Sequence, residues 1–242
     1  MSFITRAVSG WTELNEALRN APPATVVVIN PYADDETAPA REMFTLMEAF
    51  PSVAVVGAFV VTPARVGDVR QMLQAGISGV VNLRVDTTPE VAARHIREAV
   101  GRPVKRQVEA ALPQHLSADA RHIIRAACDV ALVGGGVDDV AAVFEVNAKT
   151  LSLWCNKFKL GPTRSLLVWI RLLLAASLLE DRGRTVDSAA RAAGYSSDRG
   201  LRRAFEQTLG TAPSTVRKGG ALALVSRAFR EHLVAVAAIG RG

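Results

Sequence analysis

The chain has 242 residues, a hydrophobic content of 49% and a formal net charge of +6. This length has room for two domains, and the apolar content supports buried cores, which excludes a disordered chain. The longest apolar run, Ser165–Leu179, is interrupted by Arg171 and is too short to cross a bilayer. We expect neither a signal peptide nor contact with a membrane, and we predict a cytoplasmic protein.

The positive charge is concentrated in the second half of the chain. Residues 1–116 contain 11 Lys and Arg against 12 Asp and Glu, a net charge of −1. Residues 117–242 contain 18 Lys and Arg against 11 Asp and Glu, a net charge of +7. Lys and Arg side chains that neutralise phosphates supply most of the sequence-independent affinity of proteins for DNA. The asymmetry favours a nucleic-acid partner over the alternative that an Arg-rich genome raises the charge everywhere.

Strand and helix patterns alternate over residues 1–100. The apolar runs Thr25–Asn30, Val53–Val61 and Gly79–Leu83 are typical of buried parallel strands, and Ile4–Ser9 is a weaker strand candidate. Amphipathic patterns predict helices over Trp11–Asn20, Ala38–Phe50, Arg65–Ala75 and Pro89–Val100. Repeated strand–helix units predict an α/β domain with a parallel sheet that is covered on both faces.

The order of these elements resembles a response-regulator receiver domain, which has a flavodoxin-like fold. The resemblance rests on TVVVINP from Thr25, the apolar strand after Pro51, and QAGISGVVNL from Gln74. On that mapping the chain begins near the second strand of a receiver, so the first strand and its acidic pair are missing. The resemblance therefore implies a degenerate, truncated receiver-like domain over residues 1–100.

The same mapping leaves this domain without its phosphorylation residues. The phosphoacceptor-equivalent position is Asn30, which is inactive because it has no carboxylate, and the switch and lysine positions hold Gly57 and Leu83. Without the acidic pair, Mg²⁺ lacks the hard oxygen ligands that it prefers. The acidic run Asp34–Glu36 could supply metal ligands, but a solvated loop is the favoured interpretation. We therefore expect no metal and no other cofactor.

Residues 101–116 are predicted to be a linker, because GRPVKRQVEAALPQ has two prolines, a basic cluster and little apolar periodicity. The domain predicted for residues 117–242 begins with a helix over Leu116–Leu132, for which Ser117 is the expected N-cap. A further amphipathic helix is expected after Lys218.

Two helix-turn-helix patterns lie between these helices, at about 138–160 and 185–210. The first reads VDDVAAVFEVNAKTLSLWCNKFKLG from Val137, and the second reads TVDSAARAAGYSSDRGLRRAFEQTLGTAPSTVR from Thr185. In each, a short helix with a small packing residue leads to a turn position, Glu145 or Gly194. A turn former lets the second helix swing out and enter the DNA major groove. Glu145 in place of a glycine indicates a strained turn.

The second pattern resembles the AraC/XylS family of bacterial transcription regulators. The resemblance rests, in order and spacing, on Ala190, Gly194-Tyr195-Ser196, Leu201, Arg203, Phe205, Gly210, Pro213 and Arg217. It extends through the connecting helix SLLVWIRLLLAASLLED and the first pattern, over roughly residues 137–218. It implies binding to double-stranded promoter DNA as a homodimer or on paired sites, with RNA polymerase as a further partner.

The second recognition helix carries a basic face opposite its core anchors. Arg199 and Arg203 lie one helical turn apart on that face, and the resemblance implies that they are base-reading positions. Arg can bind O6 and N7 of guanine with two hydrogen bonds. The predicted phosphate contacts are Arg202, Ser196 and Ser197. The alternative interpretation of the cluster is a solvated basic face.

The first recognition helix departs from the family pattern. Lys149 takes the first reading position and Leu153 takes the second, where an arginine is common. Leu153 could contact a thymine methyl group, and Asn156 and Lys157 are further candidates for DNA contact. We therefore expect the first motif to position the domain and the second motif to read the sequence.

No catalytic motif is present, and Cys128 and Cys155 lie in apolar helical patterns without metal-ligand spacing, so an enzyme is not expected. We predict a sequence-specific transcription regulator of the AraC type, with a phosphorylation-incompetent receiver-like domain for regulation or dimerisation. One alternative is a protein-interaction module whose degenerate helix-turn-helix domain binds DNA weakly or not at all. Another is a small-molecule sensor with a pocket at the carboxyl edge of the sheet, near Asn30–Ala33 and Gly57–Phe59.

Overall fold

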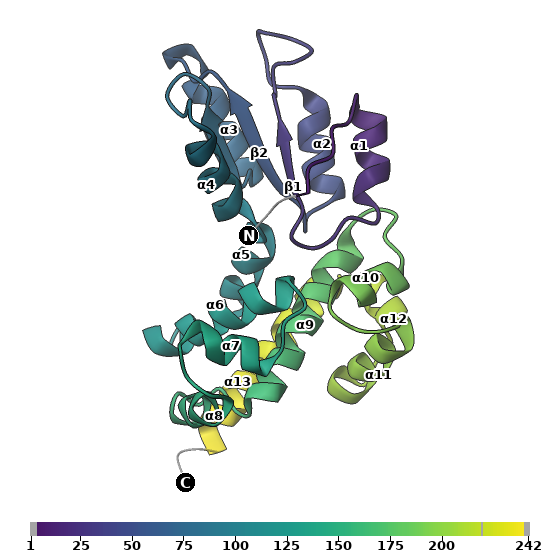
Figure 1. Cartoon of the computed structure of the whole chain (residues 1–242). Coiled ribbons are helices and arrows are strands. Elements are labelled where there is room, and N and C mark those ends of the chain that lie inside the picture. The colour runs from purple at the N-terminus through teal and green to yellow at the C-terminus, as the bar shows by residue number, and fades with distance from the viewer. Residues whose placement is uncertain (1–3, 219, 240–242) are drawn as a thin grey trace.

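The structure is a computed structural model that describes residues 4–218 and 220–239. An α/β part lies above a larger helical part in the view of Figure 1. The α/β part comprises α1 (Trp11–Leu18), β1 (Val26–Ile29), α2 (Arg41–Ala49), β2 (Ala54–Phe59), the short 3-10 helix η1 (Pro63–Arg65), α3 (Val66–Ala75), β3 (Gly79–Asn82) and α4 (Pro89–Ala99). The helical part comprises α5 (Arg102–Ala111), α6 (Ala118–Leu132), α7 (Val137–Val143), α8 (Ala148–Lys157), α9 (Thr163–Glu180), α10 (Val186–Ala192), α11 (Asp198–Leu209), α12 (Pro213–Lys218) and α13 (Ala221–Ile239).

The sheet has three parallel strands in the order β1-β2-β3. Val26 is opposite Ala54, and Val56 is opposite Gly79. The three strands agree with the predicted ranges to within one or two residues at each end. Because many α/β folds contain three parallel strands, the sheet is compatible with a flavodoxin-like domain and is not specific to it.

Helices cover both faces of the sheet. On one face, α1, α2 and α3 pack against the central strand, and the buried cluster there is Leu18, Ala21, Val27, Tyr32, Met43, Leu46, Phe50, Val53, Val55, Phe59, Met72 and Ile77. On the other face, α4 covers the smaller cluster Ala54, Val56, Val81 and Ala99. The strand prediction for Ile4–Ser9 is wrong: residues 4–8 form no strand, because Ile4 and its neighbours are exposed and cover no sheet face.

The segment 101–116, which the sequence predicts to be a linker of little apolar periodicity, is largely helical. Helix α5 occupies most of this segment, and Val104 and Val108 on its inner face are buried in the core of the helical part. Arg230 of α13 donates hydrogen bonds to the carbonyl oxygens of Ala110 and Ala111 at the end of α5. The apolar face was difficult to recognise because basic and polar residues separate its few apolar positions.

Helix α9 is the centre of the helical part, with Leu172–Leu179 fully buried. Helix α13, the amphipathic helix expected after Lys218, packs along it through Val225, Phe229 and Leu233. The Trp169 ring of α9 lies 5.7 Å from the ring of Phe229. Over the described ranges, no helix has both the length and the apolar character needed to cross a bilayer.

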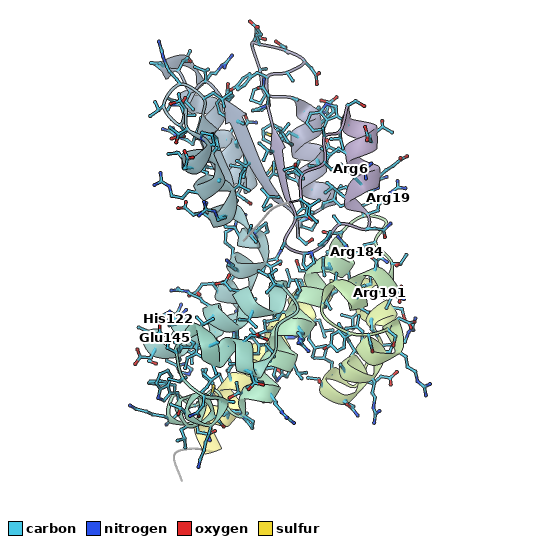
Figure 2. All side chains as sticks on the ribbon, viewed as in Figure 1. Arg6, Arg19, His122, Glu145, Arg184 and Arg191 are labelled. Atoms are coloured by element: carbon cyan, nitrogen blue, oxygen red, sulfur yellow. The ribbon has the colours of Figure 1, made fainter. Side chains whose placement is uncertain are left out.

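The two parts meet where α9 ends. The main-chain N–H of Arg182 donates to the carbonyl oxygen of Ala49 at 2.7 Å. Arg184, which Figure 2 shows at this junction, donates to the carbonyl oxygens of Leu18 and Ala21 from the α/β part. The segment that begins the second helix-turn-helix motif is therefore attached to the α/β part by hydrogen bonds.

Candidate nucleic-acid interface

Each predicted helix-turn-helix pattern folds as a pair of helices, α7 with α8 and α10 with α11. The small residues Ala141 and Ala190 are buried where the helices of each pair cross. Both turns use the left-handed backbone region, with φ of 55° at Glu145 and 82° at Gly194. A left-handed conformation costs a residue with a Cβ atom more than it costs glycine, so the first turn is strained, as the sequence predicted.

Helix α8 presents a polar face to solvent. Its start is fixed by Asn147, whose side chain accepts a hydrogen bond of 2.9 Å from the N–H of Thr150. Leu151 and Cys155 face the core, and the four predicted contact residues of this helix, Lys149, Leu153, Asn156 and Lys157, are all exposed. Leu153 is 60% exposed, which is unusual for a leucine and leaves it free to contact an apolar base edge.

Helix α11 has one fully buried face and one exposed basic face. Leu201 and Phe205 are fully buried, whereas Arg199 and Arg203 are exposed on the opposite side. Ser197 is the N-cap and accepts a hydrogen bond from the N–H of Gly200 at 3.4 Å. Its hydroxyl proton remains available for a phosphate oxygen.

Arg202 and Ser196 are also exposed. Arg202 donates through Nε to Asp198 Oδ2 at 3.2 Å, one turn earlier on α11. Because the two side chains are 44% and 43% exposed, this pair contributes little stability, and the guanidinium can exchange it for a phosphate. The structure thus presents all nine predicted DNA-contact side chains on recognition helices or at their starts.

The two recognition helices lie on opposite sides of the lower end of the helical part in Figure 1. Helix α9, which connects the two motifs, has 18 residues and is about 27 Å long at the usual rise per residue. Two successive major grooves on one face of DNA are about 34 Å apart. A connection of this length suits two helices that enter neighbouring grooves.

Arg171 on α9 contacts the start of the first motif and the turn of the second motif. Its Nη2 donates to the carbonyl oxygen of Gly135, just before α7, at 2.9 Å. Its guanidinium also packs against the second turn, since a Cβ atom added at Gly194 would lie 3.5 Å from Nε. The sequence marked Arg171 only as an interruption of an apolar helix, and nothing in the local pattern indicated that it contacts both motifs.

The carboxyl edge of the sheet, where Asn30 follows β1, has a different chemistry. The Asn30 side chain accepts a hydrogen bond from the N–H of Tyr32 at 3.0 Å, so it closes a local turn after β1. Tyr32 donates through its hydroxyl to Asp68 at 2.7 Å. Burial, together with this hydrogen bond, raises the pKa of Tyr32 to about 12. Within residues 4–218 and 220–239, no group of three or more His, Cys, Asp or Glu side chains is arranged to hold a metal ion.

Comparison with known protein families identifies one match. Residues 140–219 match the family described as helix-turn-helix domain, a range that begins within α7 and includes the whole of α8, α9, α10 and α11. This region is an AraC-type helix-turn-helix domain. The match supports a DNA-binding transcription regulator and implies a location with the DNA, in the cytoplasm or nucleoid. No curated protein and no solved structure matches the chain.

Proposed function

We propose that the chain regulates transcription by binding promoter DNA at specific sequences, with α11 as the main reader and α8 as the positioning helix. The observation that carries this proposal is the pair of protruding helices with exposed Arg199, Arg203 and Lys149, within a region that matches a helix-turn-helix family. The leucine at position 153 supports the unequal division, because it offers the first motif only an apolar contact.

For the α/β part we propose a regulatory or dimerising role that does not use phosphorylation. Its support is the sequence mapping to a receiver-like domain, in which Asn30 stands at the phosphoacceptor position. The Asn30 side chain is an amide, so it has no carboxylate to accept a phosphoryl group. Its oxygen already accepts a hydrogen bond from the N–H of Tyr32. Homodimer formation and contact with RNA polymerase follow from the family resemblance and belong to this proposal.

The first test measures the binding of the full chain to a fluorescent duplex of mixed sequence at two salt concentrations, about 50 and 200 mM. We expect an affinity that falls steeply with salt, because each neutralised phosphate releases counterions. Replacement of Arg199, Arg202 and Arg203 by alanine together should reduce the salt dependence. Absence of binding at the lower salt concentration would contradict the proposal and favour the protein-interaction module.

A further inference from the structure

The connecting helix α9 carries a strip of three side chains that the two recognition helices do not account for. Arg164, Val168 and Arg171 are spaced by four and three residues, so they lie on one side of the helix. Arg164 and Val168 are exposed and Arg171 is half-buried, whereas most of α9 is buried in the core. This α9 strip is therefore the part of the helix that a partner can reach.

Two adjoining cavities lie along the α9 strip. The first, of about 410 Å³, is formed by the starts of α7 and α9 and by the first turns of α8. The second, of about 360 Å³, continues along α9 past Val168 to Arg171. Both cavities are lined by Arg164, and the first is also lined by Lys149. The strip therefore begins beside the residue of α8 that is expected to reach DNA.

The other end of the α9 strip lies at the second motif. The guanidinium of Arg171 contacts the turn at Gly194, which precedes the second recognition helix. The strip thus extends from the start of α8 to the turn before α11. A minor groove separates two successive major grooves on one face of a duplex. When α8 and α11 enter such a pair of major grooves, the α9 strip lies over the minor groove between them.

The charges along the α9 strip favour a polyanion. Three cations, Lys149, Arg164 and Arg171, line the two cavities together with one carboxylate, Asp138. Within the part of the chain that the structure describes, neither Lys149 nor Arg164 forms an ion pair. Arg171 already donates to the carbonyl oxygen of Gly135. Arg164 is therefore the cation of the strip that can extend to a partner.

We propose that Arg164 enters the minor groove midway between the two half-sites and selects A·T pairs there. The inference rests on the proposed function. A narrow, A·T-rich minor groove concentrates negative potential and attracts a guanidinium, whereas the amino group of guanine projects into the groove of G·C pairs. Val168, one turn along the strip, has no donor for a phosphate. The strip thus offers one guanidinium to the groove in place of a row of phosphate contacts.

The test uses a duplex that the full chain selects from a random library, with the half-sites kept and the middle of the spacer changed. The spacer contains A·T, G·C or inosine·cytosine pairs. Inosine lacks the amino group of guanine, so an inosine·cytosine pair resembles A·T in the minor groove and G·C in the major groove. We expect similar affinities for the A·T and inosine·cytosine spacers, and an affinity for the G·C spacer that is about threefold to tenfold weaker.

Two variants of Arg164 separate its shape from its charge. Arg164→Lys keeps the charge without the planar guanidinium, and Arg164→Met removes both. We expect the preference for A·T over G·C to fall below about twofold in both variants, with the affinity for the G·C spacer largely kept in Arg164→Lys. Arg227→Met is the matched control and should retain the full preference. Arg227 is also exposed, but it lies on α13, which packs against the Trp169 side of α9.

Equal affinity for the three spacers, or an unchanged preference in Arg164→Met, would overturn the inference. A uniform loss of affinity in Arg164→Met would also overturn it, because it would show a contact with phosphates alone. Preference for A·T over inosine·cytosine would place the reading in the major groove and would contradict the inference too. These results leave sequence-specific binding by α8 and α11 intact. Failure of the full chain to select any site would instead overturn the proposed function and, with it, this inference.

Discussion

The Ser52 hydroxyl donates a hydrogen bond of 2.6 Å to Oδ2 of Asp181, a residue that follows it by 129 positions. The Ser52 N–H donates to the other oxygen at 3.1 Å, and Arg184 Nε donates to Oδ2 at 3.1 Å. All three side chains are at most 2% exposed. A carboxylate and a guanidinium that are buried together in this way connect the α/β part to the start of the second reading motif.

Replacing Arg184 should destabilise the whole chain, because it leaves the Asp181 carboxylate buried without its cation. Burial already raises the pKa of Asp181, so the charged form depends on Arg184 and Ser52 for its stability. For Arg184→Met we expect a loss of about 3–5 kcal/mol in the free energy of unfolding, measured with urea. Arg6→Met, in an exposed pair with Glu13, should leave the free energy of unfolding nearly unchanged.

The double variant Asp181→Leu with Arg184→Met distinguishes two causes of instability. One is the loss of the ion pair itself, and the other is a buried Asp181 carboxylate that has no cation beside it. We expect it to be more stable than Arg184→Met alone, because no unpaired charge remains buried. If the double variant were the less stable of the two, the buried charge would not be the cause of the loss.

The two motif turns allow a matched pair of glycine substitutions. Glu145→Gly relieves a left-handed residue and should stabilise the chain by about 0.5–1 kcal/mol, after the extra flexibility of glycine in the unfolded chain is counted. Gly194→Ala imposes the same strain on the second motif and should destabilise it by about 1–2 kcal/mol. Thermal unfolding of both variants measures the effects, and shifts of the same sign would contradict the strain at Glu145.

Stability should fall in mild acid because of His232. Burial lowers the pKa of this imidazole below its ordinary value of 6.5, and its Nε2 has no hydrogen-bond partner among the described residues. The unfolded chain therefore binds a proton more readily than the folded chain. The contribution of the neutral His232 side chain to the free energy of unfolding is fully present above the pKa of the unfolded chain. It is lost as the pH falls through the pKa of the folded chain.

Urea unfolding at about pH 7.5 and pH 5.5 tests this dependence. His232→Phe should reduce the loss of stability at the lower pH, since Phe can keep the contact with the ring of Trp169, which lies 5.1 Å from the imidazole. His115→Phe, at an exposed position, is the control. An unchanged difference between the two pH values in His232→Phe would exclude this residue as the cause.

The two recognition helices should contribute unequally to sequence preference. Arg203→Ala is expected to weaken binding to a preferred site by about 1–3 kcal/mol and to relax the preference at one base pair. Lys149→Ala should reduce the binding free energy by less than Arg203→Ala does, and it should weaken binding to all sequences alike. Competition titrations with single-base variants of the site measure both effects. An equal or reversed effect of the two substitutions would contradict the assignment of α11 as the reader.

The elements with strong local patterns could be predicted from the sequence. The continuous β-branched run at Val26–Ile29 indicated a strand correctly. The helix predicted over Arg65–Ala75 ends at Ala75 as expected, and the next residue, Gly76, has a φ of 98°. Helix α5 was missed because its apolar positions are few and separated by charges. The Ser52–Asp181 bond and the contacts of Arg171 join residues that are far apart in the chain, and such pairs leave no local periodicity.

The most direct test of sequence-specific reading is selection of bound duplexes from a random library with the full chain, at two salt concentrations. We predict that a defined sequence motif is recovered and that its enrichment weakens as the salt concentration rises. Recovery of bound DNA without a motif, or no recovery at either salt concentration, would contradict the account.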